Sequence, residues 1–316
     1  MKPALVVTGS LNMDFVVSVD RLPAPGETVM GRDFRMIPGG KGANQACAAG
    51  KLGAGRVDVR MVGRVGYDWF ADHLKASLSA AGVDVSAVHA TKSQPTGVAL
   101  IWVDGCGQNS IVVAPGANAA LAASEIGALR RVFQGARMAL FQLESPLDTV
   151  RAGLALAHEE GLTTMLDPAP AQPLSADLLR SVDILTPNES EACLLLGMPA
   201  RRIHDEQCPG IAGALLALGP RAVILKLGEQ GCFYFDGALA IRSPAFRVQA
   251  VDTTAAGDTF NAGLAVALVE GRPVEDALRF ANACAALSVT RAGAQSSIPS
   301  RAEVDAFLAG SPRVAQ

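Results

Sequence analysis

The sequence predicts an α/β fold with a central, mostly parallel β-sheet, helices on both faces of that sheet, and a small second β-sheet. Three observations carry this prediction. The apolar run 4–8 and the segment 223–227, which is apolar except for Lys226, are typical of strands buried in a parallel sheet. From residue 124 onward, helical and strand-like segments alternate, as in βαβ units. Elsewhere, short strands follow one another with no helix between them, which predicts the separate small sheet.

The composition disfavours several classes of protein. The 316 residues are 50% hydrophobic and 18% charged, as expected for a globular protein with a sizeable core. A net charge of −3 provides no basic surface for nucleic acid. No segment approaches the ~18 consecutive apolar residues of a membrane helix, and the N-terminal apolar run is too short for a signal peptide. We therefore expect a cytoplasmic protein with no nucleic-acid or membrane partner.

The cysteines form neither a C-x-x-C pair nor a zinc-like spacing. We expect them to be buried free thiols in a reducing compartment. They are Cys47, Cys106, Cys193, Cys208, Cys232 and Cys284.

The first strand, 4–8, ends at Gly9 and is followed by alternating polar residues. Asn12 and Asp14 should share one face of an extended segment. Polar side chains just beyond the carboxyl end of a central strand lie where open α/β sheets bind ligands. An ordinary polar turn is the alternative interpretation.

The small sheet is predicted from two pairs of strands. Segments 15–19 and 28–37 flank a turn with no helix between them, so they should be antiparallel, and 97–103 with 108–113 form a hairpin. We assign residues 14–38 and 96–114 to this sheet, and 1–13, 39–95 and 115–316 to the main domain. A sheet this small is marginal alone, so it should pack on substrate, on the main domain or on a second copy.

A glycine-rich stretch, 39–45, leads into a predicted helix over 46–52. Its glycines permit close backbone approach, and Lys41 and Asn44 supply polar groups at the helix start. The spacing does not match a phosphate-binding P-loop or a dinucleotide fingerprint. Farther on, 57–62 and 68–81 are predicted as a strand and a helix.

Later strands also end in polar residues. Glu144 follows the strand 138–143 and precedes the helix 147–160, so it is either a helix-cap acid or a ligand. Asp167 ends the strand 162–167 in the same layer of loops. Asn188 and Glu191 are spaced i, i+3, which fits a capping box or a magnesium and phosphate site.

The stretch 251–263 carries the clearest chemistry. It joins a strand-like segment, 246–251, to a helical pattern over 259–269. The small residues Ala255, Ala256 and Gly257 leave backbone N–H groups free to face an anion at a helix N-terminus. Asp258 is either a helix cap or a base that orients a nucleophile. An anion hole containing a carboxylate suits phosphoryl transfer to a hydroxyl group.

Three motifs together resemble the ribokinase-like (PfkB) family of carbohydrate kinases: Gly-Gly-Lys-Gly-Ala-Asn at 39–44, N-x-x-E at 188–191 and Ala-Ala-Gly-Asp at 255–258. The resemblance runs through nearly the whole chain. It implies a ribokinase-like fold whose small sheet is a lid over the sugar and often the contact of a homodimer. The implied activity is ATP-dependent phosphorylation of D-ribose at the 5-hydroxyl, with ATP, Mg²⁺ and K⁺ as cofactors.

The resemblance also assigns site residues. Implied sugar contacts are Asn12, Asp14, Gly40, Lys41, Gly42, Ala43, Asn44, Glu144 and Asp258. Implied nucleotide contacts are Asn188, Lys226, Leu227, Gly228, Glu229, Gln230, Gly231, Gly257 and Asn282. Mg²⁺ is expected near Asn188 and Glu191. K⁺ is expected at backbone carbonyls of Thr254, Ser288, Arg291 and Gly293 and at side-chain oxygens of Asp252 and Ser297.

In the implied mechanism Asp258 accepts the hydroxyl proton, and the N–H groups of residues 255–257 hold the phosphoryl charge. Lys226 departs from the family pattern, which often has threonine there; a lysine either reaches a phosphate, which we favour, or solvent. The alternatives are a family member with another acceptor (deoxyribose, a nucleoside or a ketose), and a sugar-binding regulator without catalysis. A Rossmann dehydrogenase is disfavoured because its glycine fingerprint is missing.

Overall fold

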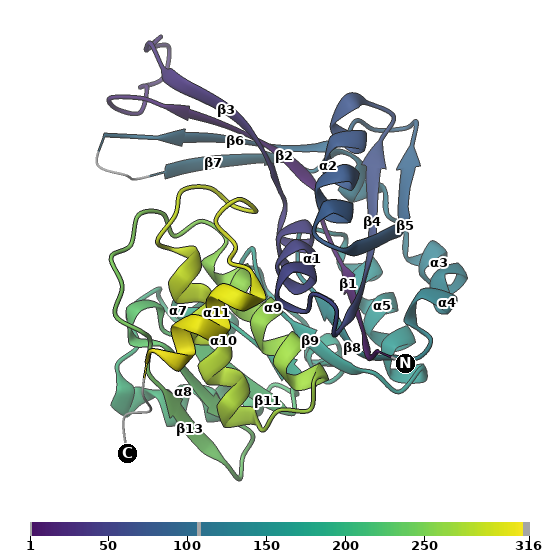
Figure 1. The fold of residues 1–316 in the computed structure, drawn as a ribbon, viewed down its shortest axis with the longest axis vertical. Coiled ribbons are helices and arrows are strands. Elements are labelled where there is room, and N and C mark those ends of the chain that lie inside the picture. Colours follow the sequence, from purple (N-terminus) through teal and green to yellow (C-terminus); the bar gives the residue numbers. More distant parts are fainter. Residues whose placement is uncertain (1, 106–108, 312–316) are drawn as a thin grey trace.

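The computed structural model describes residues 2–105 and 109–311, and within these ranges the chain forms two β-sheets (Figure 1). The large sheet has nine strands in the order β13-β12-β11-β10-β9-β8-β1-β4-β5. Its strands are β1 (Ala4–Thr8), β4 (Asp58–Gly66), β5 (Val83–Thr91), β8 (Ala136–Phe141), β9 (Thr163–Leu166), β10 (Ile184–Leu185), β11 (Ala222–Lys226), β12 (Cys232–Phe235) and β13 (Ala240–Ser243). All neighbouring pairs from β11 to β5 are parallel, and β12 and β13 add antiparallel strands at one edge.

Helices cover both faces of the large sheet. They are α1 (Lys41–Leu52), α2 (Trp69–Ala80), α3 (Ala123–Ile126), α4 (Arg130–Phe133), α5 (Leu147–Glu159), α6 (Ala176–Leu179), α7 (Glu189–Leu195), α8 (Cys208–Leu216), α9 (Ala256–Val269), α10 (Val274–Ser288) and α11 (Arg301–Ala309). Short 3-10 turns are η1 (Gly116–Ala120), η2 (Gly127–Leu129), η3 (Asp205–Gln207) and η4 (Gly228–Gln230).

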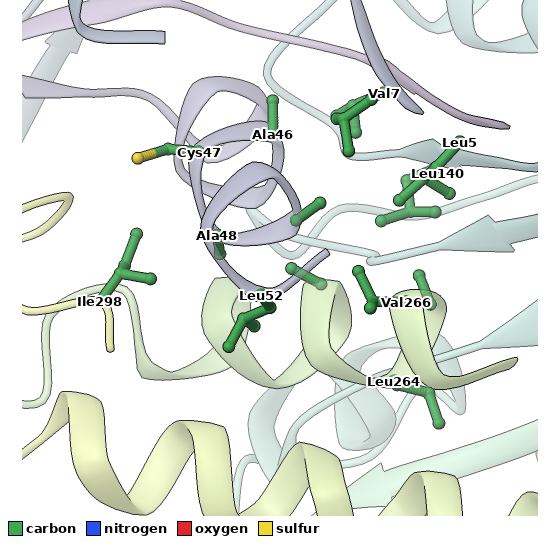
Figure 2. Packing of buried hydrophobic residues seen from close by; sticks show 14 of the residues in the cluster. Leu5, Val7, Ala46, Cys47, Ala48, Leu52, Leu140, Leu264, Val266 and Ile298 are labelled. Carbon is green, nitrogen blue, oxygen red and sulfur yellow. The ribbon is translucent and has the colours of Figure 1, made fainter. Parts of the chain in front are cut away.

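The central strand β1 supplies side chains to the cores on both faces. Leu5 and Val7 belong to the cluster that includes α1, α9 and α10, whereas Val6 belongs to the cluster around α5. This follows from the two-residue period of a strand. Figure 2 shows the first cluster, in which Leu264 and Val266 of α9 lie below helix α1. The continuous apolar runs of the sequence therefore reflect burial on both faces.

The small sheet has the order β3-β2-β6-β7, with β2 (Asn12–Ser18), β3 (Arg32–Gly39), β6 (Gly97–Val103) and β7 (Asn109–Ala114). The predicted antiparallel pairs, β2 with β3 and β6 with β7, are confirmed, and β2 pairs with β6 in parallel. Figure 1 shows this sheet projecting from the body at the top of the view. Cys106 and Gln108, which the hairpin prediction included, lie outside the described residues.

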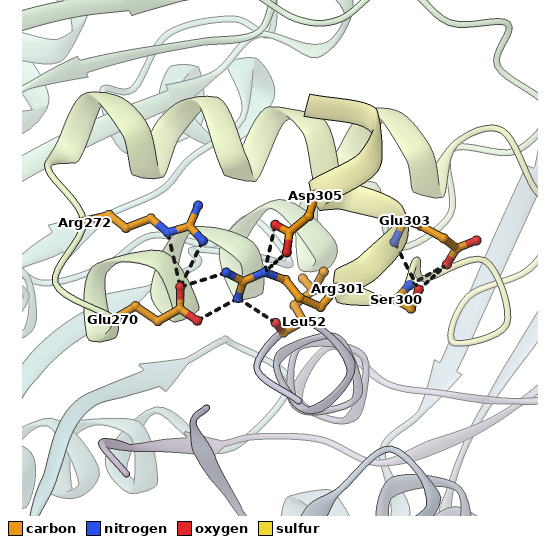
Figure 3. A network of polar contacts seen from close by, with 7 residues as sticks. All are labelled: Leu52, Glu270, Arg272, Ser300, Arg301, Glu303 and Asp305. Carbon is orange, nitrogen blue, oxygen red and sulfur yellow. Dashed lines mark hydrogen bonds and ion pairs between the residues drawn. The ribbon is translucent and has the colours of Figure 1, made fainter. Parts of the chain in front are cut away.

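The C-terminal helix α11 is anchored by a buried arginine (Figure 3). Arg301 donates to Glu270 Oε1 at 2.6 Å, to Asp305 at 3.0 Å and to the Leu52 carbonyl at 3.2 Å. Its guanidinium therefore connects α11 with the ends of α1 and α9, next to the loop 289–300. A buried cation with several hydrogen-bonded acceptors is costly to disturb.

Several boundaries differ from those predicted. The segment 246–251 is not a strand; it is irregular chain, and part of it lines a cavity described below. The helices predicted to begin at 46 and 259 begin earlier, at Lys41 and Ala256. The glycine-rich motif at 39–44 and the Ala-Ala-Gly-Asp motif at 255–258 therefore extend into the first turn of a helix rather than lying before it. β5 was not predicted at all. The first helical segment of the alternation predicted from residue 124 onward is divided into α3, η2 and α4.

Two further predictions concern burial and membranes. The five cysteines inside the described ranges are free and buried, as expected, while Cys106 lies outside those ranges. Among the described residues, no helix combines the length and apolar character that crossing a bilayer requires.

Candidate active site

The N-terminus of α9 forms the centre of the site. Ala255 caps the helix in the left-handed region, with φ of 57°, and no side chain caps the first turn. The Ala256 N–H donates to the Thr253 carbonyl at 3.2 Å. Among the described residues no side chain caps the turn, so the Ala255 and Gly257 N–H groups are left for another acceptor. The Lys226 ammonium lies beside the same turn. A Cβ atom added to Gly257 would be 3.6 Å from Lys226 Nζ. The turn thus combines a helix dipole with a nearby cation, which favours an anion.

Asp258 does not cap the helix. Its Oδ2 accepts a hydrogen bond from Asn44 Nδ2 and its Oδ1 one from Gln45 Nε2, both at 3.1 Å. Both donors come from α1, which packs against α9 through small residues such as Ala46 and Ala262. The capping interpretation of Asp258 is therefore wrong, and the carboxylate lies buried between two helix N-termini with each oxygen bonded once.

The electrostatics of this centre are dominated by burial. Burial raises the pKa of Asp258, and Asp167 adds to the rise, whereas the Lys41 ammonium and the hydrogen bonds from Asn44 and Gln45 oppose it. Burial opposes the charge of Lys41, but four carboxylates, led by Asp258, raise its pKa overall. A proton can therefore reside on Asp258 at a higher pH than on an ordinary aspartate.

On the side facing the small sheet, the expected sugar residues gather around β1 and β2. Asn12 Oδ1 accepts from Asn118 Nδ2 at 2.7 Å, and Glu144 Oε2 accepts from the Lys41 backbone N–H at 3.1 Å and from Ser10 Oγ at 2.5 Å. A cavity of about 430 Å³ is lined by Asn12, Asn118 and Glu144 together with apolar residues.

Asp14 lies at the same end of β2, with its carboxylate against Gly39. A Cβ at Gly39 would come within 2.1 Å of Asp14 Oδ2, which explains the glycine. Burial, followed by the charges of Glu144 and Asp258, raises the pKa of Asp14 to about 7. Gly40, with φ of 88°, begins α1 close to the Asn12 backbone. Asp14, Glu144 and Asp258 thus form a cluster of acids that repel one another.

On the other side of the α9 N-terminus lies a larger cavity of about 740 Å³. Its walls are largely apolar, with Phe246, Val248, Phe260 and Val289 among the lining residues. Of the expected nucleotide residues, Lys226, Gly228, Glu229, Gly231, Gly257 and Asn282 line it, whereas Asn188, Leu227 and Gln230 do not. Asn282 also packs as a buried polar residue, donating to Ser243 Oγ at 3.0 Å. An apolar cavity with a few polar groups suits a planar base.

A third cavity, of about 460 Å³, lies between these two regions. It shares Lys226, Gly228 and Gly257 with the large cavity and includes Lys41 and Asp258. Lys226 Nζ donates to Asp167 Oδ1 at 2.8 Å, so the lysine is ion-paired inside the site rather than directed to solvent. The central cavity therefore brings two lysines to the space next to the anion hole.

Asn188 and Glu191 line this central cavity as well and form the capping box of α7. Glu191 Oε2 accepts from the Asn188 backbone N–H and its Oε1 from Asn188 Nδ2, both at 2.8 Å. Burial raises the pKa of Glu191; Lys226 opposes this rise and Asp167 adds to it. The capping-box interpretation is confirmed, and the Glu191 carboxylate also lines the cavity. The magnesium and phosphate interpretation stays a prediction.

The residues expected to bind a monovalent cation come from the segment before α9 and from the end of α10 with the loop that follows it. Asp252 accepts from the Thr254 N–H at 2.9 Å and from the Gly293 N–H at 2.8 Å. Although burial opposes it, these hydrogen bonds lower the pKa of Asp252. The hydroxyls of Ser288 and Ser297 donate to local carbonyls, and the Arg291 side chain pairs with Glu303. Asp252 thus ties the segment before α9 to the loop after α10.

Comparison with known proteins agrees with this geometry. A family model described as "pfkB family carbohydrate kinase" matches residues 2–301. The chain belongs to the pfkB family of carbohydrate kinases. The resemblance found in the sequence is therefore confirmed, and so is the fold class.

Individual relatives cover nearly the whole chain. A ribokinase of Bacillus subtilis is 42% identical over 305 residues, covering 96% of this chain and 99% of the relative. A deoxyribokinase of Salmonella typhi is 34% identical over 305 residues, covering 96% and 98%. The structure of Arabidopsis thaliana ribokinase complexed with ribose and ATP has a TM-score of 0.88 at 37% identity, covering 98% and 99%.

Sequence inspection missed three polar residues of this pfkB kinase site. Gln45 and Asn118 contact expected site residues directly, and Asp167, noted only for its position at a strand end, pairs with Lys226. Gln45 directly follows the Gly-Gly-Lys-Gly-Ala-Asn run, and that position was the only signal for it. Asn118 lies in η1 with no recognisable motif around it.

Proposed function

We propose that the protein catalyses the ATP-dependent phosphorylation of D-ribose at the 5-hydroxyl, giving D-ribose 5-phosphate. The observation that carries this proposal is the position of Asp258. It lies in the first turn of α9, beside N–H groups without a side-chain cap, between a cavity with apolar walls and a cluster of hydroxyl-binding groups. A carboxylate there can meet a sugar hydroxyl on one side and a phosphoryl group on the other.

The sugar would bind between β2, the start of α1 and Glu144. Asn12, Asp14, Asn44 and Glu144 offer carboxylate and amide groups suited to several hydroxyls, and Gly40, Lys41, Gly42 and Ala43 offer backbone and one cationic group. Support comes from the burial of Asn12, Asp14 and Asn44 around one end of β2. Polar groups that are buried before the ligand arrives reject analogues that lack a matching hydroxyl.

In the reaction, the sugar oxygen forms a bond to the γ-phosphorus while the bond from that phosphorus to the bridging oxygen of ADP breaks. The hydroxyl proton passes to the Asp258 carboxylate. The Ala255, Ala256 and Gly257 N–H groups, with Lys226, stabilise the charge on the transferred group. The adenine would occupy the large cavity near Asn282, and residues 227–231 would lie along the nucleotide. A weak base suffices because the transition state is loose.

The site also suits Mg²⁺. Glu191 is a buried carboxylate with a raised pKa beside a second acid, so a cation near it is favourable, and each of its oxygens keeps capacity beyond one hydrogen bond. Asn188 and Glu191 would hold the ion, directly or through water. When bound, Mg²⁺ neutralises phosphate charge.

A monovalent cation, K⁺, would bind between the loops that Asp252 joins. The fit rests on Asp252, whose lowered pKa keeps it charged and whose carboxylate accepts from the Thr254 and Gly293 N–H groups. The carbonyls of Thr254, Ser288, Arg291 and Gly293 and the Ser297 hydroxyl would supply the other ligands. When bound, the ion would stiffen the turn that precedes α9.

We further infer that residues 14–38 and 96–114 form a lid that closes over the sugar and pairs two subunits into a homodimer. Successive residues of β7, Ile111, Val112 and Val113, are all exposed although they point to alternate faces, so both faces of the sheet are uncovered there. One face would cover the sugar and the other would contact the partner. Buried free thiols and a need for ATP fit a cytoplasmic location, and the net charge of −3 argues against nucleic-acid partners.

A second candidate function is phosphorylation of another acceptor. Because the chain is similar to a deoxyribokinase of Salmonella typhi, 2-deoxyribose is the first alternative acceptor to consider for this protein. A nucleoside or ketose kinase, or a regulator that binds sugar without catalysis, remains a lesser alternative.

The test is an ADP-release assay on purified protein with Mg-ATP. D-ribose, 2-deoxyribose, fructose and adenosine are compared, each with K⁺ and with Na⁺ alone. We expect the highest kcat/KM with D-ribose and a higher rate with K⁺. Preference for another acceptor would discard the substrate assignment, and no turnover with any acceptor would discard the kinase function.

A further inference from the structure

Gln45 lies buried between the two aspartates at the centre of the site. Only 1% of the residue is exposed, and its Nε2 donates to Asp258 Oδ1 and to Asp167 Oδ2, each at 3.1 Å. Its Oε1 accepts from Gln142 Nε2 at 2.7 Å. A glutamine amide has two N–H donors on one nitrogen, so both donors are used, and the two carboxylates define which end of the amide faces them.

Of the two residues that donate hydrogen bonds to Asp258, Gln45 is the one whose position does not depend on the sugar. The other partner, Asn44, is an expected sugar contact, and its Oδ1 has no hydrogen bond within the described protein. An incoming hydroxyl can therefore engage Asn44 and change its orientation. Gln45 is enclosed by protein groups and has no such freedom. It is the group that can hold the Asp258 carboxylate in one rotation throughout turnover.

Asp167 extends this contact to the phosphate side of the site. Its Oδ2 binds Gln45, and its Oδ1 accepts from Lys226 Nζ at 2.8 Å. Lys226 lines both the large cavity and the central cavity. An unbroken chain of hydrogen bonds thus runs from Lys226 through Asp167 and Gln45 to Asp258.

This series of hydrogen bonds can transmit a change at Lys226 to Asp258. An anion that binds beside Gly257 competes with Asp167 for the Lys226 ammonium. The Asp167 carboxylate is then less neutralised and attracts the Gln45 amide more strongly. Donation from Gln45 to Asp258 Oδ1 weakens in turn, and a carboxylate that loses a donor becomes more basic.

We propose that Gln45 is a positioning residue that orients the Asp258 carboxylate and couples it, through Asp167, to Lys226 at the phosphate side of the site. This proposal rests on the phosphoryl-transfer function proposed above. Its consequence is that the base gains strength when the phosphates are present.

The first test replaces Gln45 by methionine, which has a similar length and no donor. Gln45→Met should lower kcat by about 10- to 100-fold, because a misplaced reacting group costs about that much, while KM for sugar and for ATP changes little. The acid limb of the kcat profile should move to higher pH. The charged groups that act on Asp258, namely Lys41, Asp167 and Asp14, stay unchanged.

Gln142→Met is the matched control. Gln142 is equally buried and is bonded to Gln45, but it is bonded to neither carboxylate. It should leave the acid limb where it is in the wild type. Equal shifts in the two variants, or no shift in Gln45→Met, would overturn the positioning role, since loss of packing alone would affect both alike.

The coupling is tested with a double-mutant cycle of Gln45→Met and Lys226→Met on kcat at saturating ATP. Coupled residues should show non-additive losses, with the double variant losing less than the product of the single losses. Strict additivity would overturn the coupling.

A measurement without turnover separates this proposal from the proposed function. The melting temperature of Gln45→Met, without ligands, should fall more steeply between pH 5 and pH 8 than that of Gln142→Met, because its Asp258 is harder to ionise in the folded state. Inactivity of the wild type on every acceptor would contradict the proposed function, and the melting curves would still decide the role of Gln45. Parallel curves would overturn it.

Discussion

The site contains buried carboxylates whose ionisation makes the folded protein less stable. Asp14, Asp258 and Glu191 are buried carboxylates whose pKa values are raised, in each case chiefly by burial. Such groups lower the stability of the folded protein once they ionise. Lys41, with its raised pKa, offsets part of this repulsion. Stability alone therefore does not explain the cluster, whereas the proposed binding of ligands would.

Asp14 gives the sharpest prediction at this scale. Its pKa rises from 3.8 to about 7, so between these values the folded protein keeps a proton that the unfolded chain has lost. Folding takes up this proton, and the free energy of unfolding falls as pH rises through the window, by at most about 1.4 kcal/mol per pH unit. Asp14→Asn removes the titration, so its stability gain over wild type should be larger at pH 8 than at pH 5.

Urea unfolding at the two pH values measures this difference. Asp58→Asn, at an exposed position at the start of β4, is the matched control. An Asp14→Asn effect of the same size at pH 5 and pH 8 would contradict the raised pKa.

At the scale of elements, the small sheet stands out because it is apolar and uncovered. Phe34 of β3 and Ile111 and Val112 of β7 are each more than half exposed. An apolar sheet of four strands gains stability by covering such a face. A second subunit that covers it would also hold the strand that carries Asp14 over the sugar.

We predict that Ile111→Asp turns a dimer into a monomer and raises KM for the sugar, because a buried unpaired carboxylate in the contact is costly. Sedimentation velocity at micromolar concentration gives the assembly, and the ADP-release assay gives KM. Leu239→Asp, which changes an exposed leucine between β12 and β13, should leave both unchanged. A wild-type protein that sediments as a monomer would refute the dimer.

At the scale of the whole molecule, much of the fold could be predicted from local patterns. The apolar runs of β1 and β11 and the alternation after residue 124 correctly indicated a parallel sheet, since burial on both faces removes polar residues from a strand. β5 was missed because its mixed pattern of buried and exposed residues resembles no single template. The segment 246–251 was wrongly predicted as a strand; its residues Phe246, Val248 and Ala250 instead line a cavity.

The site was predictable only in part. Glycine-rich and acidic motifs marked the ends of α1, α7 and α9, because helix N-termini have recognisable chemistry. The contacts among them were not visible, since Gln45 and Asp258 are 213 positions apart and only the packing of α1 on α9 brings them together. The pairing of Lys226 with Asp167 escaped for the same reason.

The central claim is that Asp258, which lines the cavity beside the N-terminus of α9, is the base of a sugar kinase. The most direct measurement compares Asp258→Asn with wild type in two experiments, turnover of Mg-ATP with D-ribose and calorimetric binding of D-ribose. We predict a loss in kcat of about 10²- to 10⁴-fold, the usual contribution of a general base, with ribose still bound at similar affinity. A variant that turns over at nearly the wild-type rate would contradict the account.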